Sequence, residues 1–116
     1  MPVYTDSYKG VFDGVNEIDL VPVPPSGKTV VTMVRVVNID SESITPKIRV
    51  HDSTRVNEDD EYLYVSNDFA MEASEYMQID GVVCVLGAGQ KLVGSLDAAI
   101  TTDNPQWMVV LAREVY

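Results

Sequence analysis

Three consecutive residues, His51, Asp52 and Ser53, have the side-chain types of a hydrolase catalytic triad. In such a triad a carboxylate orients an imidazole, and the imidazole removes the proton of a hydroxyl. Neighbours on an extended chain point to opposite sides, so these three cannot form that relay with one another. His51 is also the only histidine, so every imidazole-dependent mechanism would depend on this one position. We expect a strand that ends here and enters a loop.

Two glycine-containing segments resemble nucleotide-binding loops but lack essential residues. Residues 26–29, Ser-Gly-Lys-Thr, end like a Walker A loop, yet Pro22 stands where that motif requires its first glycine. Residues 87–92 begin like a dinucleotide fingerprint, yet Leu92 occupies the place of the third glycine. Both segments lead into β-like runs, whereas a phosphate site needs a helix N-terminus aimed at the anion. We therefore expect turns at both places and no nucleotide cofactor.

Metal ligands are few. One cysteine, Cys84, and one histidine cannot close a tetrahedral zinc site. Residues 58–61, Glu-Asp-Asp-Glu, supply the hard oxygens that calcium prefers, but no calcium-loop pattern surrounds them, and four consecutive acids are typical of a solvated loop. The sequence predicts no metal and no cofactor, and it leaves calcium binding by residues 58–61 open. Eighteen acidic residues allow many carboxylate pairs and single out none, so we expect that the protein is not an enzyme.

The charge balance excludes some partners. Eighteen acidic and eight basic side chains give a net charge of -10. Nucleic-acid binding draws its affinity from Lys and Arg that displace counterions, so a nucleic-acid ligand is not expected. Anionic membrane surfaces are disfavoured for the same reason. The first residues form no signal peptide, and no apolar run approaches the ~20 residues of a membrane helix.

The length of 116 residues is that of one domain, and its apolar segments have β character. Residues 28–39 are rich in β-branched side chains, which suit a pleated sheet better than a helix. Residues 67–77 could hold at most a helical turn, and residues 80–81, Asp-Gly, are a turn signal. Strands are expected at residues 17–23, 28–39, 44–51, 61–65, 82–86, 91–96, 98–102 and 106–116. This spacing predicts an all-β protein, a single antiparallel β-sandwich of about eight strands.

The two longest expected strands are apolar on both faces, which a two-layer sandwich does not require. On residues 29–39, one face carries Val30, Thr32, Val34 and Val36, and the other carries Val31, Met33, Arg35, Val37 and Ile39. On the last strand, Trp107, Val109, Leu111 and Val115 alternate with Met108, Val110 and Ala112. A second cover is needed, either from a neighbouring subunit or from loops of the same chain.

Residues 1–16 are expected to form an extended N-terminal arm before a sandwich at residues 17–116. The arm is too apolar to remain free, so it either adds a strand to the sheet edge of a neighbour or packs on its own domain. Apolar residues of the arm and of the two long strands form the predicted interface. They are Tyr4, Tyr8, Phe12, Val31, Met33, Val37, Trp107, Met108 and Val110.

The order of segments resembles that of small phage and prophage virion proteins. The matching residues are 20–24 (Leu-Val-Pro-Val-Pro), 27–29 (Gly-Lys-Thr), the Val-rich strand 30–38, residues 44–50, the turn 86–92 and the final strand 107–115. Gln90 stands where Asp is commoner in that turn. The resemblance implies a jelly-roll-like sandwich that forms homodimers or homotrimers and has no catalytic residues.

The same resemblance implies that the chain is a capsid decoration (cement) protein of a tailed phage. It would be assembled in the host cytoplasm, would lie on the capsid exterior, and would bind and stabilise the shell of the major capsid protein. Two alternatives remain open: a neck, tail or fibre component of the virion, and a carbohydrate-binding β-sandwich module. The sequence does not decide between dimer and trimer.

Overall fold

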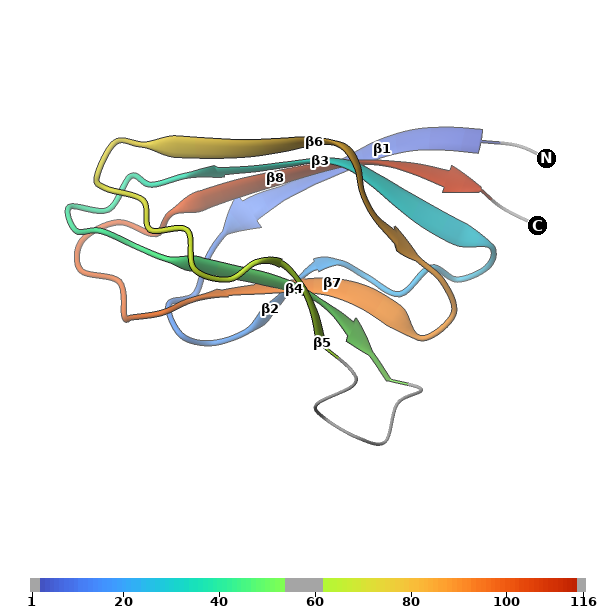
Figure 1. Ribbon diagram of the computed structural model, residues 1–116, viewed down its shortest axis with the longest axis horizontal. Helices are drawn as coiled ribbons and strands as arrows, with labels where there is room; N and C mark the ends of the chain where they lie inside the picture. Colours follow the sequence, from blue (N-terminus) through green and yellow to red (C-terminus); the bar gives the residue numbers. More distant parts are fainter. Residues whose placement is uncertain (1–2, 54–61, 115–116) are drawn as a thin grey trace.

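The computed structural model describes residues 3–53 and 62–114, and within them the chain forms eight strands in two antiparallel sheets that pack face to face (Figure 1). The first sheet contains, in spatial order, β1 (Val3–Val11), β8 (Gln106–Glu114), β3 (Lys28–Val37) and β6 (Tyr76–Leu86). The second sheet contains β2 (Ile18–Val21), β7 (Gln90–Leu96), β4 (Pro46–Asp52) and β5 (Tyr62–Ser66). The predicted all-β sandwich is confirmed.

The strand order defines the topology. The first sheet runs β1-β8-β3-β6 and the second runs β2-β7-β4-β5, so most connections cross from one sheet to the other. Two interleaved four-stranded sheets of this order form a jelly roll. In Figure 1 the long strands of the first sheet lie above the shorter strands of the second.

The core lies between the sheets and takes one face of each strand. On β3 the side chains of Val31, Val34 and Val36 are fully buried, and on β8 those of Val109 and Leu111 are. The second sheet contributes most of its buried side chains from β7 and β4. These are Ile48, Val50, Leu92 and Leu96.

The N-terminal segment belongs to the sandwich. β1 pairs with β8 along its whole length, from Val3 opposite Glu114 to Val11 opposite Gln106. Phe12, the next residue, is fully buried in the core, and its amide donates to the carbonyl of Pro105. Residues 3–12 therefore pack on their own domain. The structure does not show them as an arm that reaches the sheet of a neighbour. The backbone groups on the inner side of this edge strand pair with β8, whereas a free arm would leave them to water.

Two local expectations, a turn at residues 80–81 and a strand at residues 98–102, were wrong. Residues 80–81 form a bulge inside β6, since the register shifts between Val31 opposite Cys84 and Met33 opposite Asp80. Gly81 allows this bend because it adopts a φ of 105°. Residues 98–102 form a loop and not a strand. The amide of Thr101 in this loop donates a hydrogen bond to the side chain of Asp40 and not to a neighbouring strand. Residues 67–77 hold no helical turn; Met71 instead forms a bridge with Ile44.

Candidate interaction surface

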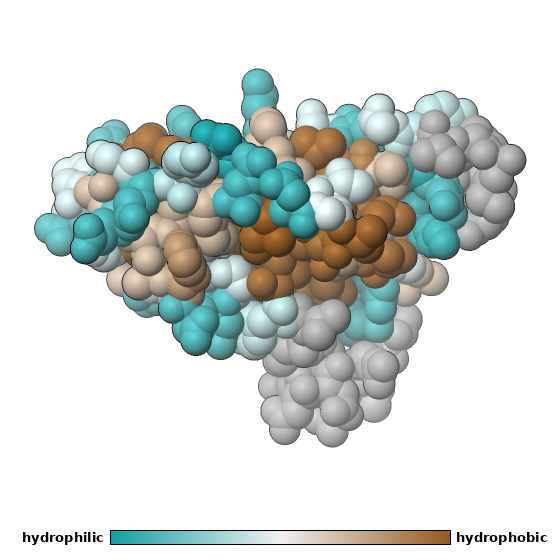
Figure 2. Space-filling model, turned by 45° about the horizontal axis from the view of Figure 1, so that its top comes forward, coloured by the Kyte–Doolittle hydropathy of each residue, from teal (hydrophilic) through white to brown (hydrophobic). Residues whose placement is uncertain are grey.

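The outer face of the first sheet carries a group of apolar side chains that are exposed or half-buried. Residues opposite one another in neighbouring strands share a face, so the register fixes its membership. Its partly or fully exposed apolar side chains are Val11, Val30, Met33, Val37, Tyr76, Val85, Met108, Val110 and Ala112. We call this set the outer face. Figure 2, which brings the top of the molecule forward, shows hydrophobic side chains gathered near its middle.

The bulge explains why strict alternation assigned the faces of β3 only in part. Val30 shares the outer face with Met33 and Val37, although it is an odd number of residues from each of them. In a regular strand, residues an odd number apart lie on opposite faces. The register shifts between Val31 and Met33, and this shift interrupts the alternation of side chains between the two faces of β3. Thr32, at the shift, donates its hydroxyl to the carbonyl of Val110.

The predicted interface residues separate into two groups. Met33, Val37, Met108 and Val110 lie together on the outer face, half-buried. Phe12, Val31 and Trp107 lie in the core, and Tyr8 packs against it. Tyr4 is exposed on β1, opposite Arg113. The structure thus brings four of the nine predicted residues onto one surface, where they are free to contact a partner.

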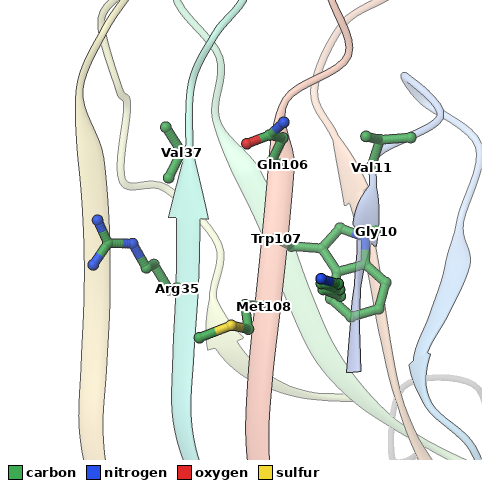
Figure 3. Close-up of a pocket in the computed structure, with 8 residues that line it drawn as sticks. Gly10, Val11, Arg35, Val37, Gln106, Trp107 and Met108 are labelled. Carbon is green, nitrogen blue, oxygen red and sulfur yellow. The ribbon is translucent and has the colours of Figure 1, made fainter. Parts of the chain in front are cut away.

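A hollow of about 700 Å³ lies at one end of the outer face (Figure 3). Its side chains come from three adjacent strands: Lys9 and Val11 from β1, Gln106 and Met108 from β8, and Arg35 and Val37 from β3. Gly10 and Trp107 also line it, and the absence of a side chain at Gly10 leaves room for the indole. This hollow could not be predicted from the sequence, because its lining depends on the register of three strands that are distant along the chain.

Two basic residues flank the hollow. Lys9 and Arg35 both stand opposite Met108, one on each neighbouring strand. The guanidinium of Arg35 donates to Gln78 (3.1 Å) and stacks on the ring of Tyr76, 4.6 Å from its centroid. In Figure 3 its end is turned away from Met108, toward β6, so its stem lines the hollow.

The outer side of the second sheet is different in character. Arg49 donates two hydrogen bonds of 2.8 Å to the carboxylate of Glu17, and Lys91 lies 2.9 Å from Asp19. These pairs satisfy the charges within the molecule, so this side offers fewer unpaired groups to a partner.

Two of the three residues that resemble a hydrolase triad contact the turn at residues 87–90. Ser53 donates its hydroxyl to the carbonyl of Gly89 (3.0 Å), and Asp52 accepts from the side-chain amide of Gln90 (3.0 Å). The hydroxyl and the carboxylate are thus oriented by other groups. Residues 87–89 form a tight turn, in which Gln90 also accepts from the amide of Gly87. A turn of this kind was predicted.

Metal-ligand types are scattered over the part of the chain that the structure describes. Within residues 3–53 and 62–114 no group of three His, Cys, Asp or Glu residues could hold a metal ion. The acidic run at residues 58–61 lies outside the described residues. Cys84 lies half-buried in β6, and burial raises the pKa of its thiol to about 11. The same described residues contain no helix that is long and apolar enough to cross a bilayer.

Asp40 organises the loops at one end of the sandwich. Its carboxylate accepts hydrogen bonds from the amides of Ser41, Thr101 and Thr102 and from the hydroxyl of Thr102. These donors stabilise the charged form, and they hold the pKa of this carboxyl well below its usual range. Asp40 therefore has a structural role, because its carboxylate joins the loop after β3 to the loop before β8.

Sequence comparisons find no relative: no protein-family model matches the chain, and no curated protein is significantly similar to it. Solved structures share its fold. A chain in the capsid of the Helicobacter pylori bacteriophage KHP30 is 14% identical, with a TM-score of 0.51, 95% of this chain covered and 85% of that one. A chain of the cyanophage Pam1 capsid asymmetric unit is 12% identical, with a TM-score of 0.50 and coverages of 98% and 85%. A crystal structure of PirA is 12% identical, with a TM-score of 0.49 and coverages of 95% and 94%.

The two phage capsid chains share the jelly-roll fold of this chain. At 12–14% identity they transfer no site residues, and one fold hosts many functions. Because 85% of each phage chain is covered, both are only slightly longer than this one.

Proposed function

We propose that the protein is a structural component of a phage virion, a decoration (cement) protein that lies on the capsid exterior. It would bind the shell of the major capsid protein and stabilise it, and it would have no enzymatic activity. The observation that carries this proposal is the outer face: a sheet surface with exposed or half-buried valine and methionine side chains, which no other element among the described residues covers. Surfaces of this kind mark contacts with other proteins.

Two further observations support the proposal. The two phage capsid chains that share the fold are similar in length to this chain, as expected for a small accessory subunit. The net charge of -10 also keeps the protein away from DNA, which suits a component outside the shell. Self-association into a dimer or trimer through part of the same surface is included in the proposal.

The test uses particles of the phage that carries the gene, made with the gene intact and with the gene deleted. We expect the chain in purified particles in an amount comparable to that of the major capsid protein. Particles without it should release their DNA at a lower temperature, because the shell has lost contacts that oppose the internal pressure. A scarce band would point to a neck, tail or fibre component. Absence of the chain from intact particles would overturn the virion role.

A further inference from the structure

The basic residues of the described chain fall into two groups. Lys28, Arg49, Lys91 and Arg113 each have a nitrogen within 3.6 Å of a carboxylate oxygen of the same molecule. Among the residues that the structure describes, Lys9, Arg35 and Lys47 have no carboxylate within ion-pair distance. In a protein with eighteen acidic residues, cations without an acidic neighbour are unexpected.

Two of these three unpaired cations flank the same hollow. Lys9 and Arg35 stand on either side of Met108, so their Cα atoms are about 10 Å apart, which is two strand spacings. Met108 lies between them, and Val11 and Val37 stand in the next row of the sheet, on either side of Gln106. Lys47, the third cation, lies on the outer side of the second sheet and lines no part of this hollow.

From this juxtaposition we infer that the hollow binds an acidic segment of a partner protein, with an apolar side chain of that segment seated on Met108, beside Val11 and Val37. Carboxylates beside that apolar side chain would pair with Lys9 and Arg35. Arg35 uses one of its five N–H donors on Gln78 in the structure, so donors remain for a carboxylate. Burial under the bound segment would strengthen both ion pairs, because it lowers the local dielectric constant.

The chemistry of the hollow favours a protein segment over other anions. Its valine and methionine lining matches an aliphatic side chain, which inorganic phosphate lacks. Two cations on a molecule of net charge -10 are too few to hold a polyphosphate backbone. A second copy of the chain would present the same cationic end of its outer face if the two faces met symmetrically, so like charges would oppose that contact. The inference goes beyond the proposed function, since it concerns the chemistry of the ligand and holds for a partner in any assembly.

The experiment uses the full chain and three synthetic peptides with blocked ends. The first is acetyl-Asp-Glu-Leu-Glu-Asp-amide, the second replaces the acids by Asn and Gln, and the third replaces Leu by Ser. Binding is followed by the amide chemical shifts of the ¹⁵N-labelled protein and by the fluorescence of Trp107, the only tryptophan. We expect the acidic leucine peptide to shift residues of the hollow and to bind roughly tenfold or more tightly than either control peptide, as hydrogen bonds to charged groups predict.

The variants Lys9→Gln and Arg35→Gln should each weaken this binding several-fold, and Lys47→Gln is the matched control that should leave it unchanged. Circular dichroism of each variant shows that the fold is retained. Equal binding of the neutral peptide, or an equal loss with Lys47→Gln, would overturn the inference. So would tighter binding of inorganic phosphate or of a DNA oligonucleotide, or shifts of the hollow that depend only on protein concentration, which would identify a second copy as the occupant.

This outcome is independent of the particle experiment. If the chain is absent from virions but the acidic peptide still binds the hollow, the proposed function fails and the inference about the ligand stands. If the chain is abundant in virions but the peptide series shows no preference for acids, only the inference fails.

Discussion

Gly94 of β7 lies against the ring of Phe12: a Cβ atom at Gly94 would come within 3.0 Å of Cε1 of Phe12 and within 2.9 Å of Cδ1 of Leu20. Both neighbours are buried, at 0% and 1% exposure, so neither side chain has space into which it could move. Gly94→Ala should therefore destabilise the protein by about 1–3 kcal/mol, the range for overpacking in a core. Urea unfolding followed by circular dichroism measures this change in the free energy of unfolding.

Gly87→Ala is the control for that substitution. A Cβ atom at Gly87 would have only the side-chain oxygen of Gln90 as a neighbour, at an ordinary distance of 3.6 Å. We expect a change within about 0.5 kcal/mol, as for substitutions away from the core. If the two variants unfold at the same urea concentration, the close approach of Gly94 to Phe12 is incorrect.

Phe12 itself should be among the most important residues of the N-terminal segment for stability. It is fully buried and joins the core next to Trp107 and Leu20. Phe12→Ala should cost about 3–5 kcal/mol, because it removes a ring and leaves a cavity. Tyr4→Ala, in the same segment but 57% exposed, should cost less than about 1 kcal/mol. Thermal unfolding of both variants makes the comparison, and similar losses would contradict the burial of Phe12.

The sequence was sufficient for the fold class and for most strands, and it failed at β1 for a physical reason. β1 reads Val-Tyr-Thr-Asp-Ser-Tyr-Lys-Gly-Val, with polar residues on both faces. An edge strand with partial burial has no clear period of two, so periodicity could not separate it from an irregular arm. Its assignment depends on pairing with β8, which is almost one hundred residues away.

The outer face could be predicted only in part. Excess apolar surface on the two long strands was correctly read as surface that the core does not use, and it led to Met33, Val37, Met108 and Val110. The same reasoning also selected Val31, because nothing local in the β3 sequence reveals where its pleat changes phase. Thr32 is an extra residue of β3 relative to β8, because Val31 and Met33 pair with the consecutive residues Leu111 and Val110. The hollow required the register of three strands and was beyond the sequence.

Asp40→Asn should destabilise the fold and change its response to acid. The pKa of Asp40 is lowered in the folded state, so its stabilising contribution is complete above the pKa of the unfolded chain, about 3.9, and is lost as the pH falls below that value. The variant should lower the melting temperature at pH 7 and should lose less stability than the wild type below pH 4. Asp68→Asn removes the same charge at an exposed aspartate outside these loops, and its melting temperature at pH 7 should stay close to that of the wild type. Melting curves between pH 2 and pH 7 would contradict the prediction if Asp40→Asn and the wild type lost stability in parallel.

Cys84 should be unreactive in the folded protein. With a pKa of about 11, roughly one thousandth of the thiol is ionised at pH 8, and the thiolate is the reactive form. Modification with Ellman's reagent at pH 8 should therefore be slow without denaturant and rapid in concentrated urea. A native rate close to that of a free thiol would show that Cys84 is not shielded by the packing of β6 against the core.

Val110→Glu tests the outer face as the contact with a virion partner. Val110 is half-buried beside Met33, and a glutamate there places a charge among apolar side chains without entering the core. Ser95→Glu puts the same charge on the outer side of the second sheet, beside Lys47, and serves as the control. Both variants should melt close to the wild type, since both positions face away from the core. Val110→Glu should reduce incorporation into particles by roughly tenfold or more, as expected when an unpaired charge is buried at an interface, while Ser95→Glu should be incorporated normally. Normal incorporation of Val110→Glu would contradict the outer face as the docking surface. A loss seen with Ser95→Glu alone would indicate that the contact lies on the second sheet.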